Sequence, residues 1–253
     1  MEVFPSKTEF NSILSEIFEN NFLSNFISGE NGEKTLDLFY CFSYTLWETN
    51  RSLNLTAVTD TRGIILKHLA DSLLISKYIP NGASVIDVGC GGGFPTFPLA
   101  IARPDLRITA LDSTEKKINF VRDTASKLGL TNITPVCARA EELAKGDMRE
   151  SFDCATARAV ASLPILCELC LPFVKVGGRF VAMKSLKIDD ELAAAKSKEL
   201  FSRLGGESTP AVDTVELKDC DDILSRSIAV TKKISATPAK YPRAYAQIVK
   251  NSK

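Results

Sequence analysis

The feature that most constrains this chain is a glycine-rich turn that directly follows an apolar strand. The sequence VIDVGCGGGFP begins at Val85 and holds four glycines within five consecutive positions. Glycine accepts a positive φ and leaves no Cβ between the backbone and a ligand, so such a turn can fold closely around a bound molecule. Pro95 and Pro98 suit the first turn of a following helix. The pattern predicts a ligand pocket at the carboxyl end of a strand, built around Asp87, Gly89, Gly91 and Gly93.

From about Ser84 onward, short apolar runs of strand length alternate with helix-like segments. The segment 114–128 places Ile118, Val121 and Ala125 on one stripe, as an amphipathic crossover helix does. Such alternation predicts an α/β fold, with a mostly parallel sheet covered by helices on both faces. The expected strands are 85–88, 106–111, 133–137, 152–157, 179–183, 211–217 and 228–233.

The N-terminal part of the chain has a different pattern. Residues 7–50 carry apolar side chains at helical spacing, interrupted at 28–32 by a stretch rich in glycine and asparagine. The chain is also too short for two full-sized domains. We therefore expect an N-terminal helical extension over 1–50 and one compact domain over 51–253.

The composition limits both the compartment and the partners. Lys and Arg together number 31, as do Asp and Glu, so nucleic acid could bind only at a local basic surface. No apolar run is long enough to span a membrane, and the acidic start of the chain does not resemble an export signal, which predicts a cytoplasmic protein. Seven irregularly spaced cysteines predict reduced thiols. Cys167 and Cys170 lie in a segment typical of a buried helix, so no metal site is predicted.

The spacing within the turn bears on which ligand it holds. The dinucleotide fingerprint GxGxxG would need glycine at position 94 or 96, where the chain has Phe94 and Thr96, and this disfavours a nicotinamide oxidoreductase. Asp87 would repel a pyrophosphate but suits a ligand with a cationic amino acid moiety, such as S-adenosylmethionine. Asp112, at the end of the second strand, is placed to bind ribose hydroxyls. A tight connection without a ligand, in which Asp112 only caps a helix, remains the alternative.

Nine short motifs in a fixed order resemble one known family. They are NLTAV, KHLADSLL, DVGCGGGFP, LAIARPDL, LDSTEKK, ARAEE, TARAVASL, AMKS and YPR, and they extend from about Trp47 to Met183 and again over 241–243. The chain resembles the glucose-inhibited division protein B family of small-subunit ribosomal RNA guanine-N7 methyltransferases. This resemblance implies a class I methyltransferase fold, a Rossmann-like sheet of seven strands. It also implies S-adenosylmethionine as cofactor and 16S ribosomal RNA, or a 30S-type particle, as substrate.

The resemblance also carries over the family's cofactor contacts. They fall on Gly89, Phe94, Ala140, Glu141 and Arg158. Arg158 is the expected catalytic residue, with a mixed role toward cofactor and RNA, and a structural salt bridge is its alternative. The chain departs from the family pattern at Thr96 and Phe97 and in the tail that follows YPR.

The expected chemistry needs no general base. Guanine N7 has an in-plane lone pair and no hydrogen, so it can attack the methyl group directly. The fourth strand ends in TARAV, which lacks the Asn-Pro-Pro-aromatic motif of exocyclic-amine methylases and the Pro-Cys of enzymes that attack cytosine. We therefore expect Cys154 to be a packing residue. His68, the only histidine, is interpreted as structural and placed near the cofactor.

Predicted RNA contacts fall outside the glycine turn. From Thr231 to Lys253 the chain has six cations and no acid, a composition that attracts phosphate, although a solvated tail would look the same. Lys184 and Arg243 are the candidate RNA-binding residues. We expect a monomer. A small-molecule methyltransferase and a noncatalytic RNA-binding assembly factor remain alternatives, and a test of cofactor binding separates the second from an enzyme.

Overall fold

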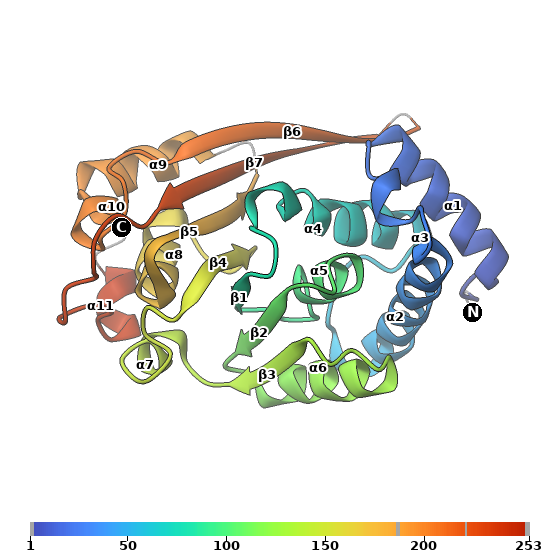
Figure 1. The fold of residues 1–253 in the computed structure, drawn as a ribbon, viewed down its shortest axis with the longest axis horizontal. Helices are drawn as coiled ribbons and strands as arrows, with labels where there is room; N and C mark the ends of the chain where they lie inside the picture. The colour runs from blue at the N-terminus through green and yellow to red at the C-terminus, as the bar shows by residue number, and fades with distance from the viewer. Residues whose placement is uncertain (1–2, 186–187, 221, 251–253) are drawn as a thin grey trace.

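A computed structural model describes residues 3–185, 188–220 and 222–250 of the chain (Figure 1). Its strands are β1 (Ser84–Val88), β2 (Arg107–Asp112), β3 (Ile133–Cys137), β4 (Phe152–Arg158), β5 (Val174–Lys184), β6 (Ala211–Asp219) and β7 (Asp222–Lys232). They form one seven-stranded sheet in the order β3-β2-β1-β4-β5-β7-β6. β1 to β5 are parallel, and β7 is antiparallel to both of its neighbours. The predicted α/β fold with a mostly parallel sheet is confirmed.

Alternate residues of each strand point to opposite faces of the sheet. Both faces are apolar, and helices cover both of them. On β1, Val85 joins one apolar core and Ile86 the other. The Val85 side is covered by α1 (Lys7–Asn20), α2 (Gly32–Leu53), α3 (Thr61–Ile64), the π-helix η2 (Ile65–Ala70), α4 (Asp71–Leu73), α5 (Thr96–Ala102) and α6 (Glu115–Lys127). The Ile86 side is covered by α7 (Ala140–Leu143), α8 (Leu163–Cys170), α9 (Ile188–Ser197), α10 (Leu200–Arg203) and α11 (Tyr245–Lys250). Short 3₁₀ turns lie at 24–26, 76–78 and 171–173.

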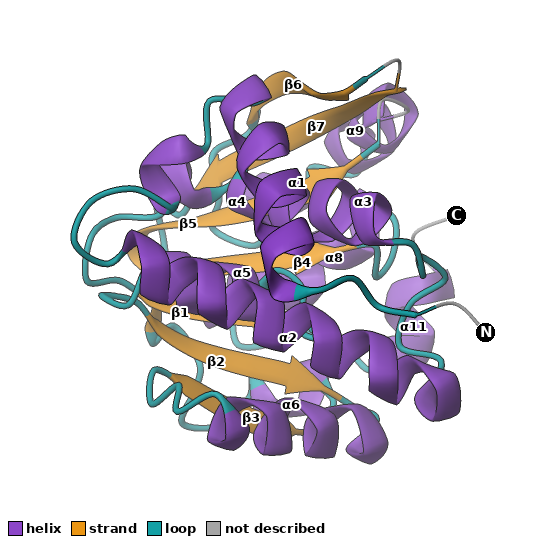
Figure 2. Cartoon of the chain, turned by 90° about the vertical axis from the view of Figure 1, so that its right-hand side faces the viewer, coloured by secondary structure: helices purple, strands orange, loops and turns teal. Residues whose placement is uncertain are grey.

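The N-terminal helices share the core of the sheet. Phe42 of α2 stacks on Phe97 of α5, with ring centroids 4.5 Å apart. Figure 2 shows α2 passing across the face of the sheet, in front of β1 and β2. The predicted break at 28–32 falls between the 3₁₀ turn at 24–26 and the start of α2, whereas α2 continues past residue 50 to Leu53. The proposed boundary at residue 50 therefore cuts a continuous helix, and the domain division stays a prediction.

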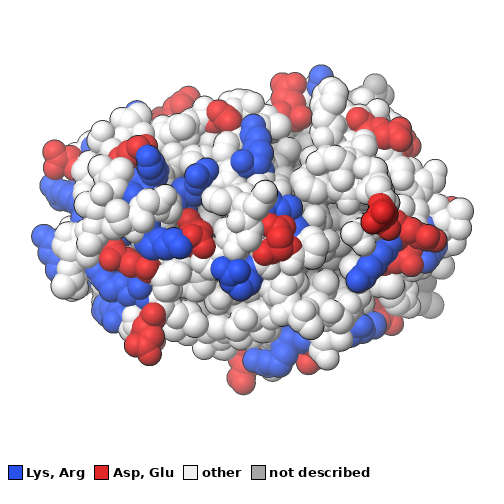
Figure 3. All heavy atoms as spheres, viewed as in Figure 1, with Lys and Arg blue, Asp and Glu red and all other residues white. Residues whose placement is uncertain are grey.

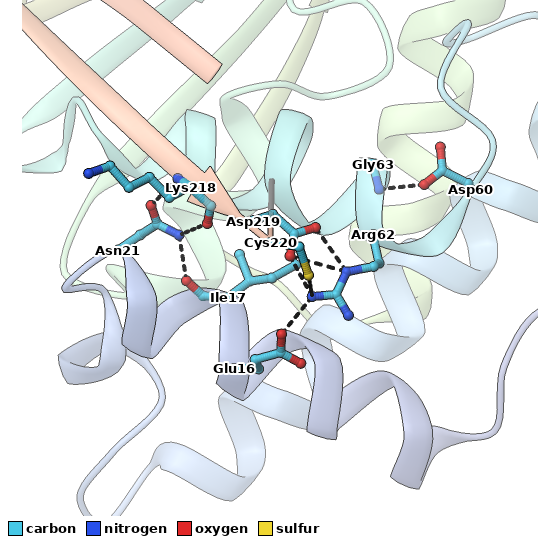
Figure 4. A network of polar contacts seen from close by, with 9 residues as sticks. All are labelled: Glu16, Ile17, Asn21, Asp60, Arg62, Gly63, Lys218, Asp219 and Cys220. Atoms are coloured by element: carbon cyan, nitrogen blue, oxygen red, sulfur yellow. Dashed lines mark hydrogen bonds and ion pairs between the residues drawn. The ribbon is translucent and has the colours of Figure 1, made fainter. Parts of the chain in front are cut away.

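The hairpin of β6 and β7 extends beyond the rest of the sheet to reach α1. β7 pairs with β5 only over 227–232, while its pairing with β6 begins at residue 222. Near the tip, the Asn21 side chain donates to the carbonyl of Lys218 at 2.8 Å and accepts from its amide at 2.6 Å. Arg62 of α3 binds Asp219 through Nε at 2.9 Å and Glu16 of α1 through Nη2 at 2.7 Å (Figure 4). Three chain segments are thus joined through one guanidinium.

On the face seen in Figure 3, basic and acidic residues are interspersed. This matches the equal numbers of basic and acidic residues. Within the described ranges, no helix combines the length and the apolarity that crossing a bilayer requires.

Candidate functional site

The strand order reverses between β1 and β4, and a groove lies at the carboxyl ends of these strands and of β2. Open α/β sheets bind ligands at such a switch point. The groove has two adjoining parts. The α7 hollow lies around Ala138, Ala140 and Glu141, and the glycine-turn hollow lies around Gly91, Phe94 and Arg158. Both parts are lined by Gly89, Asp112 and Val160, so they form one elongated site.

The glycine turn shapes the middle of the groove. The amides of Gly89 and Cys90 donate to the carbonyl of Leu111, at 2.7 and 3.0 Å, which folds the turn over the end of β2. Gly89 has φ +77°, and a Cβ there would lie 2.6 Å from Cγ2 of Val160. Gly93 lines neither hollow. A Cβ there would overlap the ring of Phe97, so this glycine allows α5 to pack against the turn.

Asp87 lies behind the turn and lines neither hollow. Its carboxylate is buried and accepts a hydrogen bond from Oγ1 of Thr96 at 2.6 Å. Burial disfavours the charged form and raises the pKa of Asp87 to about 7, against the hydrogen bond from Thr96 and the charge of Arg158. The expected contact between Asp87 and a cationic ligand stays a prediction. In this structure the carboxyl group binds Thr96, the first residue of α5.

Asp112 stands at the junction of the two hollows. Its Oδ2 accepts from the amide of Gly91 at 3.1 Å, and its Oδ1 accepts from the amide of Thr114 at 2.8 Å. Lys117 of α6 lies 3.9 Å from Oδ2 and lines the glycine-turn hollow. The carboxylate thus joins the turn to the start of α6, and it borders the groove in which Asp112 is predicted to bind ribose hydroxyls.

Ala140 and Glu141 line the α7 hollow, and their contact with the cofactor stays a prediction. The hollow also contains Arg139 and Tyr245, which the sequence analysis did not single out. Tyr245 begins α11, and its ring centroid lies 5.8 Å from the guanidinium carbon of Arg139. This end of the groove is therefore built partly by the C-terminal helix.

Arg158 and Phe94 lie together in the glycine-turn hollow. The guanidinium carbon of Arg158 is 4.9 Å from the ring centroid of Phe94, which also stacks on His68 at 4.3 Å. Nη1 of Arg158 donates to Oδ2 of Asp71 and to the carbonyl of Lys67, both at 2.9 Å. The second oxygen of Asp71 accepts from Nε of Arg226 at 2.8 Å. Two guanidinium groups therefore share one buried carboxylate, which leaves a surplus of positive charge beside the groove.

His68 is poorly suited to carry protons. Its Nε2 lies 2.6 Å from Oγ1 of Thr56, and its Nδ1 lies 3.2 Å from Nη2 of Arg158. Burial, followed by the charge of Arg158, lowers the pKa of His68 to about 3. The ring is thus neutral at ordinary pH and positions Phe94 and Thr56. Cys154 is buried in β4 outside both hollows, and burial raises its pKa to about 12.

Lys184 and Arg243 lie outside the groove, and each is paired with an acid. Nζ of Lys184 is 2.8 Å from Glu191, and Nη2 of Arg243 is 2.6 Å from the buried Glu168. Their expected RNA contacts stay predictions. Lys233, one of the six cations of the basic tail, is fully buried and cannot meet phosphate in this structure, while Lys253 lies outside the described residues.

Comparisons with known proteins agree with this architecture. A model of the GidB family, described as rRNA small subunit methyltransferase G, matches residues 36–223. The chain is 40% identical over 241 residues to the ribosomal RNA small subunit methyltransferase G of Clostridium novyi, covering 94% of this chain and 95% of that protein. It is 42% identical over 223 residues to the protein of the same name from Acetivibrio thermocellus, covering 87% and 89%.

A solved structure supports the fold alone. The structure of M. jannaschii TYW2 in complex with AdoMet matches with a TM-score of 0.53 and 15% identity, covering 70% of this chain and 80% of that chain.

Proposed function

Because the chain belongs to the GidB family of rRNA small subunit methyltransferase G proteins, we infer that it transfers a methyl group from S-adenosylmethionine to small-subunit ribosomal RNA. The observation that carries this inference is the groove at the switch point, floored by a glycine turn that has no room for a Cβ at Gly89. The acceptor is N7 of a guanine in 16S RNA.

The residues of the groove fit this cofactor chemically. Asp112 offers carboxylate oxygens to ribose hydroxyls, and the α7 hollow offers an apolar wall for a purine. At the other end, the surplus charge of Arg158 and Arg226 over Asp71 suits the carboxylate of an amino acid moiety or an RNA phosphate. When bound, the cofactor supplies an electrophilic methyl group on a sulfonium.

The protein's part in the reaction is positioning. N7 of guanine holds no proton to remove, and the one histidine beside the groove stays neutral, with its pKa lowered to about 3. Holding two reactants in line can contribute roughly 7–11 kcal/mol relative to their encounter in solution. Arg158 is proposed to orient the cofactor and to donate to guanine O6, which lies beside N7 on the same edge of the base.

The setting of the reaction follows from the same proposal. The enzyme acts in the cytoplasm as a monomer, either on free 16S RNA or on a 30S-type particle. Lys184 and Arg243 would reach RNA only by leaving Glu191 and Glu168, so the cations that border the groove, such as Lys117, are better placed for the first phosphate contacts.

Methyl transfer from labelled cofactor tests this function. Purified protein is incubated separately with 30S particles and with free 16S RNA, and the RNA is digested to nucleosides. Label is expected in 7-methylguanosine with at least one of the two substrates. Label in an exocyclic amine or a pyrimidine carbon contradicts the mechanism, and absence of transfer to both, despite cofactor binding, favours a noncatalytic assembly factor.

A further inference from the structure

The C-terminal segment, from Lys233 to the end of α11, runs from the end of β7 back to the groove. Near its start, the buried Nζ of Lys233 donates to the carbonyl of Leu171 at 2.8 Å and to Oγ1 of Thr237 at 2.5 Å. The ammonium is also 3.0 Å from Glu150. A buried lysine with these three partners fixes the first bend of the segment.

Two further anchors fix the middle of the segment. Arg149 donates to the carbonyl of Thr237 at 2.6 Å and to that of Tyr241 at 2.8 Å. Arg243 donates to Glu168 of α8 through its backbone amide at 2.7 Å and through Nη2 at 2.6 Å. Because Glu168 is buried, this pair holds the chain at one place on α8, only two residues before α11.

These contacts place the side chain of Tyr245 at the groove. Ile248 is buried against the α8 side of the core, and this packing turns Tyr245 of α11 toward the α7 hollow. Tyr245 is the only aromatic residue among the described residues that line that hollow, whose other walls include Leu111, Ala138 and Ala140. Tyr245 is 40% exposed, although the segment that leads to it is anchored at several points.

We propose that Tyr245 is a cofactor-binding residue whose ring covers the adenine of the bound cofactor. The inference rests on the proposed function, because it needs the cofactor to occupy the groove. A flat aromatic ring in a hollow whose walls include Leu111, Ala138 and Ala140 favours offset stacking on a purine. The Arg139 guanidinium lies over the same ring, with its carbon 5.8 Å from the centroid, and it lines the same hollow. Tyr245 lies beyond residues 36–223, the part that the family model matches, so that match does not include this contact.

The test measures binding of S-adenosylhomocysteine by calorimetry to the full chain and to three Tyr245 variants. Tyr245→Ala is expected to weaken binding about tenfold, and Tyr245→Phe to stay within about twofold, because no hydroxyl contact is required. Tyr245→Leu keeps apolar bulk without a flat ring and should fall between them. Gln247→Ala, exposed on the same helix, is the matched control and should bind as the wild type does.

The outcomes separate this proposal from the proposed function. If the wild-type chain takes up no S-adenosylhomocysteine, the function itself fails. If the wild type binds and Tyr245→Leu or Tyr245→Ala binds equally well, adenine stacking is overturned. Steady-state kinetics add a second readout: Tyr245→Ala should raise KM for the cofactor by a larger factor than it lowers kcat, and a fall in kcat without a rise in KM would overturn the assignment.

Discussion

At the scale of single residues, Gly89 is the glycine of the groove with the least room for a side chain. It combines φ +77° with a virtual Cβ 2.6 Å from Val160. We predict that Gly89→Ala weakens S-adenosylhomocysteine binding by about tenfold or more, because the methyl group displaces the wall of the groove. It should also lower the free energy of unfolding by about 1–3 kcal/mol. Calorimetry and urea denaturation measure the two effects.

Gly82 provides the control for this experiment. It has φ +68°, but nothing lies within 4 Å of a Cβ there. Gly82→Ala should therefore lower the free energy of unfolding through backbone strain but leave S-adenosylhomocysteine binding unchanged. Equal loss of binding in both variants would show that strain alone, not filling of the groove, weakens binding.

Arg158 and Arg226 share Asp71 but differ in where they lie, since only Arg158 lines the groove. We predict that Arg158→Ala lowers the rate of methyl transfer about a hundredfold, the usual cost of removing one preorganised donor from an active site. Arg226→Ala should reduce stability but leave the rate within about tenfold of the wild type. Single-turnover assays with RNA measure the rates. Wild-type turnover by a folded Arg158→Ala variant would remove Arg158 from the reaction.

Asp87 makes the stability of the protein depend on pH. Burial raises its pKa to about 7 in the folded state, from an ordinary value of 3.8. Between these values the folded state holds a proton that the unfolded state has released, so the contribution of Asp87 is complete below pH 4 and is lost as the pH rises through 7. We predict that Asp87→Asn gains stability relative to the wild type over this range, as measured by urea denaturation at stepped pH.

Asp105 is the matched control, because its pKa shifts in the opposite direction. Arg103 lowers the pKa of this carboxyl to about 2, so its contribution is present above about pH 4 and disappears only in stronger acid. Asp105→Asn should run parallel to the wild type between pH 4 and pH 7. If the Asp87→Asn profile is parallel as well, the carboxyl of Asp87 is not held neutral.

Local sequence was enough to place the glycine turn, Asp112 and the residues after β3 at the groove, because each lies at the carboxyl end of a strand. Asp87 shows the limit of such reasoning: alternation along β1 does not reveal whether the last acid faces the groove or the helix behind it. Tyr245 could not be predicted from local sequence, because the contacts of Arg149 and Glu168 with the preceding segment bring it to the groove. Those contacts join segments that are distant in sequence.

At the scale of elements, the hairpin of β6 and β7 is held to the N-terminal helices through Asp219 (Figure 4). We predict that Asp219→Ala lowers the free energy of unfolding by about 1–2 kcal/mol, because it removes a bidentate partner of Arg62, while screening at the partly exposed guanidinium limits the loss. Glu16→Gln, at the exposed end of the same network, should have little effect. If urea denaturation gave the same loss in the free energy of unfolding for both variants, Asp219 would contribute no more to holding the hairpin than Glu16 does.

The strands were predictable where they are buried and less so where they are not. β3 has the expected bounds, and the other parallel strands lie within a few residues of them, except that β5 begins at Val174 instead of 179. Gly177 has φ +90°, and the register between β4 and β5 shifts near Phe152. The first part of β5 is therefore irregular and lacks the apolar alternation of a regular strand. The part of β7 that does not pair with β5, residues 222–226, has no alternating apolar pattern. The π-helix η2 carries the same apolar stripe as an α-helix would, and sequence alone does not distinguish them.

At the scale of the whole molecule, the groove draws together segments from nearly the full length of the chain. Its walls include Thr56 before α3, the glycine turn, the ends of β2 and β4, and Tyr245 near the C-terminus. A ligand bound there holds the two sides of the sheet together, since α2 to α6 pack on one face and α7 to α11 on the other. Binding should therefore stabilise the chain as one cooperative unit.

Thermal unfolding tests this coupling. S-adenosylhomocysteine at about 100 times its Kd should add about 2.7 kcal/mol to the free energy of unfolding, because it binds only the folded state. For a chain of this size that corresponds to an increase in Tm of roughly 5–10 °C in a single transition. Gly89→Ala at the same ligand concentration should show a much smaller increase, and Gly82→Ala the full one. A ligand-dependent shift confined to one of two separate transitions would instead show that the helices on the two faces unfold independently, and that the groove belongs to only one of them.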